Sequence, residues 1–226
     1  MSNTKKWLIG CGGCFGVVVL LVIAVVIFLV MQVGSSTDKA SETVLGSKPP
    51  AGFMSFGFAA PDKKGAQNGF LIMFNSTNQH FVFALNTPLT RKDRETFRAI
   101  SQASPDAQKN MEALVKKAMG HAASSGQGFS PDQMTLEGTK NDKLNNGKQF
   151  SAGYLKVYSE QKGVYLPVVF GIVPEASNQG VILIALDQEN SSSDKAADLS
   201  KTYTLLANDL HQIVAGTALA DRLLAD

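Results

Sequence analysis

An uncharged apolar run near the N-terminus constrains this chain more than any other feature of the sequence. No charged side chain occurs between Lys6 and Asp38, and the stretch from Phe15 to Met31 consists almost entirely of Val, Leu, Ile, Ala and Phe. A helix needs about 20 apolar residues to cross a hydrocarbon core of roughly 30 Å. A soluble domain of this size has no use for a helix that is apolar on every face. The sequence therefore predicts a transmembrane signal-anchor helix over residues 7–33, with the lipid bilayer as its partner.

The residues that flank the run predict its orientation. Lys5 and Lys6 precede it with no acidic residue, and Trp7 suits an interfacial anchor. Positive charge stays on the cytoplasmic side, so residues 1–6 are predicted to be a short cytoplasmic N-terminus. The expected localisation is a single-pass membrane protein with its C-terminal part extracytoplasmic, either periplasmic or extracellular. A cleaved signal peptide is the alternative, because small residues follow at 34–36, although signal peptides have apolar runs of only about 7–15 residues.

Charge and cysteine content describe the part that follows the run. The net charge of +2 equals the contribution of Lys5 and Lys6, so the remainder is formally neutral. Nucleic-acid binding would require a basic surface, and this class is therefore excluded. Residues 34–50 are rich in Ser, Thr and Lys and predict a flexible tether, followed by a single domain over residues 51–226. Neither cysteine lies in that domain, so its stability must come from packing alone.

Hydrophobic patterns predict the elements of the domain. Strands are expected where short apolar, β-branched or aromatic runs lie between turn residues: 53–58, 70–74, 81–85, 134–138, 150–158, 164–173 and 181–186. Helices are expected over 90–100, 104–120 and 194–215, and a mobile loop over 121–131. The runs 70–74 and 81–85 are apolar at nearly every position, which predicts that these two strands are covered on both faces. Pro167 cannot donate to a ladder, which predicts an edge strand or a bulge there.

The element order βββ-α-ββββ-α predicts an α+β fold. It would combine the N-terminal transmembrane helix with one domain, in which helices cover a mostly antiparallel sheet. In this element order the chain resembles the antiparallel sheet-and-helix sandwich of Mog1/PsbP-like proteins. The resemblance rests on element order alone, so it implies a fold and no function.

Small residues at the start of the apolar run form two local motifs. Cys11 and Cys14 make a C-x-x-C pair at the predicted membrane boundary. Redox chemistry, a zinc site shared with a second chain and acylation remain open beside the simple tolerance of small residues at a helix end. Gly12 and Gly16 form a G-x-x-x-G pattern, which allows close helix packing and suggests a homodimer.

Two charged segments are candidate sites. Asp187, Glu189, Ser191, Ser193 and Asp198 resemble a calcium loop, but Ser192 and Lys195 stand where such a loop needs Gly and an oxygen ligand. The alternative is that residues 191–194 cap the following helix. The basic stretch 91–98 reads as a solvated helix face with an Arg91–Glu95 pair, or as a contact for an acidic partner or for lipid headgroups.

The sequence contains none of the common catalytic motifs. His80, His121 and His211 fall in no metalloprotease pattern, and neither a G-x-S-x-G nor a P-loop occurs. No catalytic residue, cofactor or metal is assigned. The expected function is non-enzymatic binding of an unknown protein partner or envelope assembly. A small-molecule or lipid-binding module and an enzyme without a recognisable motif are the alternatives.

Overall fold

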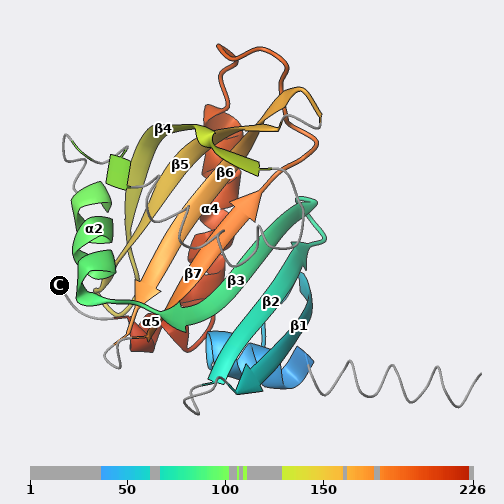
Figure 1. The fold of residues 1–226 in the computed structure, drawn as a ribbon. Helices are drawn as coiled ribbons and strands as arrows, with labels where there is room; N and C mark the ends of the chain where they lie inside the picture. Colours follow the sequence, from blue (N-terminus) through green and yellow to red (C-terminus); the bar gives the residue numbers. More distant parts are fainter. Residues whose placement is uncertain are drawn as a thin grey trace, which may run out of the picture.

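A single antiparallel sheet organises the fold (Figure 1). The computed structural model describes residues 37–61, 67–101, 106, 109–110, 129–159, 162–175 and 179–223. The strands of the sheet are β1 (Phe53–Pro61), β2 (Gln67–Asn75), β3 (His80–Pro88), β4 (Phe129–Lys143), β5 (Gln149–Ser159), β6 (Val164–Pro174) and β7 (Gln179–Leu186). Their spatial order is β1-β2-β3-β7-β6-β5-β4, so the two meanders meet where β3 pairs with β7.

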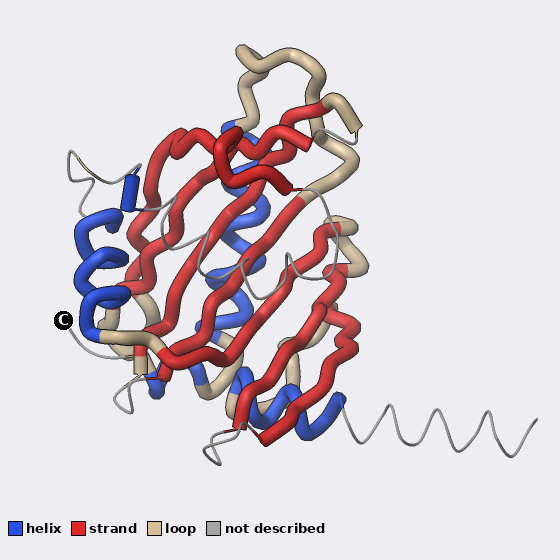
Figure 2. Tube along the Cα trace, in the orientation of Figure 1, coloured by secondary structure: helices blue, strands red, loops and turns tan. Residues whose placement is uncertain are grey.

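Four helices accompany the sheet in the described residues: a helix over 37–45, α2 (Arg91–Ser101), α4 (Ser200–Ala215) and α5 (Leu219–Arg222). Figure 2 shows that strands make up most of the fold. The helix expected over 104–120 and the loop expected over 121–131 lie largely outside the described residues.

The predicted fold class is corrected in its transmembrane part. Among the residues that the structure describes, none of the helices combines the length and the apolarity that crossing a bilayer requires. The single-pass membrane localisation and the transmembrane character of the chain are therefore not supported. The run 7–33, with Cys11, Gly12, Cys14 and Gly16, lies outside the described residues. The fold that the structure supports is the seven-stranded antiparallel sheet with its helices.

The larger apolar core lies on the face of the sheet that α4 covers, which we call the back face; the opposite face is the front. Period-2 alternation directs Leu71, Met73, Val82 and Ala84 to this face, where each is fully buried. The stripe of α4 packs over it through five buried side chains: Leu199, Tyr203, Leu206, Leu210 and Ile213. This stripe was predicted from its spacing, but the helix begins at Ser200 and not at Asp194. Residues 191–194 therefore do not cap it.

The segment expected to be a flexible tether contains a packed helix. Ala40, Val44 and Leu45 of helix 37–45 are completely buried in the same core. Two glycines explain the close approach of this helix to the sheet. A Cβ at Gly69 would lie 2.6 Å from Val44 Cγ2, and a Cβ at Gly57 would lie 3.1 Å from Ala40 Cβ. A side chain at either position would crowd the helix, and one at Gly57 would first clash with the carbonyl oxygen of Phe70 on β2, so both glycines permit the helix to dock onto β1 and β2.

The front face carries a second core over one half of the sheet only. Phe97 of α2 packs edge-on against Phe170 of β6 at a centroid distance of 6.3 Å. The buried residues around this pair come mainly from β4 to β7: Met134, Leu155, Val157, Leu166, Val168, Ile172, Ile182 and Leu186. Strand β3 reaches this cluster through the partly buried Phe83, and β1 and β2 lie at the opposite end of the sheet from α2 in Figure 1.

Pro167 lies in an interior strand, so the predicted edge position is wrong. Strand β6 pairs with β5 on one side and with β7 on the other. The carbonyl oxygen of Pro167 accepts a 3.4 Å hydrogen bond from the backbone N of Asp187, on the β7 side. Pairing of β6 with β7 ends one residue away, at Val168 and Leu186. The missing N–H of the proline therefore falls where the ladder has already ended.

Candidate functional site

A buried charged cluster is the first candidate site. His80 begins β3, Asp187 directly follows β7, and Asp209 lies in α4, so the fold joins three elements at one point. Each of the three side chains is only 2 % exposed. His80 Nδ1 lies 2.7 Å from Asp209 Oδ2, and His80 Nε2 lies 3.4 Å from Asp187 Oδ2.

Five hydrogen bonds from neutral donors stabilise the two carboxylates. Asn75 and Asn78 donate from Nδ2 to Asp209 Oδ1 over 2.8 and 3.2 Å. Asp187 accepts 2.8 and 3.1 Å bonds from the backbone N of Glu189 and Asn190, and a 2.6 Å bond from the side chain of Asn190. Buried charges are tolerated when they are paired and hydrogen-bonded in this way. The cluster thereby fixes the β2–β3 turn and the loop after β7 against α4.

The protonation of His80 follows from its two acidic neighbours. Burial disfavours the charged ring, but the hydrogen bond to Asp209 and the charges of both aspartates outweigh it, so the pKa of His80 is raised above its ordinary value. Both ring nitrogens face carboxylates and the ring is inaccessible. A general base needs a nitrogen within reach of a substrate proton. The arrangement therefore serves to hold three elements together and offers no surface for catalysis.

The segment after β7 that resembles a calcium loop already surrounds a positively charged side chain, the ammonium group of a lysine. Lys156 of β5 is 7 % exposed, and its Nζ donates 3.1 Å hydrogen bonds to the carbonyl oxygens of Lys195 and Ala197. Glu137 Oε2 lies 3.5 Å from the same ammonium. An ammonium group thus occupies the position where the loop carbonyls converge. Within the described residues, no group of three or more acidic, histidine or cysteine side chains could hold a metal ion.

The other sequence candidates lie apart. Arg91 and Glu95 form the predicted exposed ion pair at 2.7 Å on α2. His211 lies 3.8 Å from Asp142 and is partly exposed. His121, Cys11 and Cys14 lie outside the described residues. The structure therefore brings His80 and Asp187 together with Asp209, which sequence reasoning had not selected.

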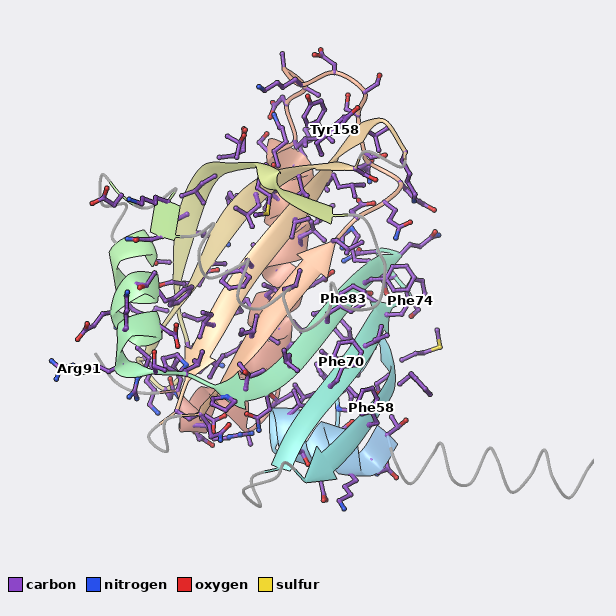
Figure 3. All side chains as sticks on the ribbon, viewed as in Figure 1. Phe58, Phe70, Phe74, Phe83, Arg91 and Tyr158 are labelled. Carbon is purple, nitrogen blue, oxygen red and sulfur yellow. The ribbon has the colours of Figure 1, made fainter. Side chains whose placement is uncertain are left out.

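An aromatic surface on the front of β1 to β3 is the second candidate site, which we call the aromatic face. The strand registers place its nine apolar side chains in three rows: Met54, Phe74 and Phe81; Phe56, Ile72 and Phe83; Phe58, Phe70 and Leu85. Phe58 and Phe70 have ring centroids 5.7 Å apart, and Phe70 and Phe83 have centroids 6.3 Å apart. Figure 3 shows Phe58, Phe70 and Phe83 following one another across the strands.

Exposure of the aromatic face is highest on the edge strand of the sheet. Ile182 of β7 is 5 % exposed, whereas Phe81 of β3 is 37 % exposed. On the edge strand β1, Met54, Phe56 and Phe58 are 61, 54 and 56 % exposed. The expectation that the runs 70–74 and 81–85 are covered on both faces is therefore wrong at Phe81. The three strands contain no Asp, Glu, Lys or Arg, so the surface is apolar without a charged side chain of its own.

No protein-family model matches the chain, and no curated protein matches it. The two sites must accordingly be interpreted from their own geometry.

Proposed function

We propose that this chain is a non-enzymatic binding module that recognises an apolar protein surface through its aromatic face. The observation that carries the proposal is the exposure of Met54, Phe56 and Phe58, each more than half exposed on one strand. Scattered apolar residues on a surface need no explanation, but a contiguous apolar patch of several hundred Å² is characteristic of an interaction site.

The size of the open area supports binding. A large aromatic side chain buries about 150–250 Å², so four side chains near half exposure leave on the order of 400 Å² open. At about 25 cal/mol per Å², covering that area would contribute roughly 10 kcal/mol before the entropic cost of association. That cost is estimated at about 4–15 kcal/mol, so further contacts around the face must add to the affinity.

Packing also favours a binding role over a folding role for these side chains. The opposite face of the same strands is sealed, with Leu71, Met73, Val82 and Ala84 at 0 % exposure. The core is therefore complete without Phe56 and Phe58. Aromatic residues that are not needed for the core are typical anchors of protein interfaces.

Site-specific photo-crosslinking in the cells that make the protein tests the proposal. Full-length chain carrying benzoylphenylalanine in place of Phe58 is compared with chain carrying it in place of Leu205. Leu205 is a matched control because it is a large apolar residue, 44 % exposed, on α4. The proposal predicts a discrete adduct from position 58 that position 205 does not give, identified by mass spectrometry and lost when Phe56→Ser is added. Equal labelling from both positions, or no adduct from position 58, would refute it.

A further inference from the structure

We infer that the protein bound by the aromatic face is a second copy of this chain, with the two faces packed on each other across a two-fold axis. This inference rests on the proposed function and names its partner. It depends on three properties of the face: its composition, its shape and its area.

The composition permits two identical faces to meet. Because β1, β2 and β3 contain no Asp, Glu, Lys or Arg, superposing the face on itself brings no like charges together. The one ionisable side chain of these strands, His80, lies on the opposite face between its two aspartates. An isologous interface requires such self-complementarity, and two-fold dimers are the commonest assemblies of identical chains.

The shape suits sheet-on-sheet packing. The nine side chains project from three adjacent antiparallel strands, so the face is continuous and lies at an end of the sheet. Two such sheets pack about 10 Å apart with their side chains interdigitated. Helix 37–45 covers the other side of β1 and β2, with Ala40 and Val44 fully buried, while Phe56 and Phe58 on the front of β1 are more than half exposed.

The area is of the order that a dimer needs. The open part of the four most exposed side chains amounts to about 400 Å². The partly exposed Phe70, Ile72, Phe74, Phe83 and Leu85 extend this surface inward. Specific interfaces bury about 800 Å² on each partner. The most exposed side chains alone supply about half of that value, so an interface between two copies must also bury the partly exposed side chains and the rim of the face.

The test uses purified full-length chain in two forms that carry different affinity tags. One form has benzoylphenylalanine in place of Phe58, and a parallel sample has it in place of Leu205. The inference predicts that irradiation yields an adduct containing both tags, at about twice the 24.1 kDa of the chain, from position 58 only. Peptide mapping should place the attachment on β1 to β3 of the second copy. Adding Phe56→Ser to both forms should lower the yield by about tenfold or more, because a central aromatic anchor is lost from both sides of the interface.

Other outcomes separate this inference from the proposed function. A two-tag adduct from positions 58 and 205 alike would show association elsewhere on the chain and would overturn the inference. Attachment within one chain would overturn it as well, because the face would then be covered by its own polypeptide. If purified chain gives no two-tag adduct while position 58 captures a different protein in cells, the second copy is refuted and the proposed function stands. If position 58 captures nothing in either experiment, both fail.

Discussion

Replacing Asp209 by asparagine should destabilise the protein strongly, because this carboxylate holds the buried cluster together. Asp209 receives the 2.7 Å contact of His80 and two hydrogen bonds from Asn75 and Asn78. An amide has one oxygen for these donors, and its NH₂ group would face at least one of them. Breaking one side of a buried ion pair costs about 3–5 kcal/mol.

Urea and thermal unfolding of the full-length chain, followed by circular dichroism, measure this cost. For a chain of this size, the predicted loss corresponds to a fall of roughly 6–20 °C in Tm. Glu95→Gln is the matched control, since it removes a carboxylate from the exposed pair with Arg91 and should cost about 0.5 kcal/mol or less. A double variant with His80→Gln should cost less than the sum of the two single changes, because both act on one cluster. If Asp209→Asn costs no more than Glu95→Gln, the cluster does not fix the three elements as argued.

Three further results are expected. Because the pKa of His80 is raised in the folded state, its contribution to the unfolding free energy should be complete below about pH 6.5 and should be lost as the pH rises through the raised value. Urea titrations at a series of pH values should show this decline in stability. The decline should be smaller in Asp209→Asn. Leu45→Ala should cost about 2–5 kcal/mol in urea unfolding, since Leu45 is 0 % exposed, whereas a flexible segment at 34–50 would show almost no effect. Gly69→Ala should cost about 1–3 kcal/mol because its Cβ would lie 2.6 Å from Val44 Cγ2, and an equal cost of the same change in a Val44→Ala background would contradict the stated cause.

Local patterns predicted the strands well. The apolar runs 70–74 and 81–85 around Asn75 to Asn78 became the hairpin of β2 and β3, with Asn75 paired to His80. The 4, 3, 4, 3 spacing of the stripe in α4 likewise matched the side chains that the structure buries. These signals depend on neighbouring residues, and one sequence is enough to carry them.

Features that depend on distant residues were not predicted. Helix 37–45 has a Ser/Thr-rich composition that resembles a linker, and its docking depends on Gly57 and Gly69 of the following strands. Its signals were the pair Ala40 and Val44, four residues apart, and Gly46, which adopts φ 69° as a helix-ending glycine does. These signals were too weak to outweigh the composition.

The two candidate sites were hidden for different reasons. His80 and Asp209 are 129 residues apart, and no local pattern could join them. The aromatic face was present in the sequence as alternating Phe residues, but a strand that is apolar on both sides does not show which side is covered. Only the packing of helix 37–45 and α4 on one side distinguishes the sealed face from the open one.

Hydroxyl-radical footprinting tests most directly whether the aromatic face is a binding surface. The modification of Met54, Phe56 and Phe58 is measured relative to Leu205, first in dilute purified chain and then in the cells that make the protein. The account predicts that all four side chains react in the dilute chain and that the three on β1 become protected in cells while Leu205 does not. Equal reactivity of the β1 residues under both conditions would contradict it.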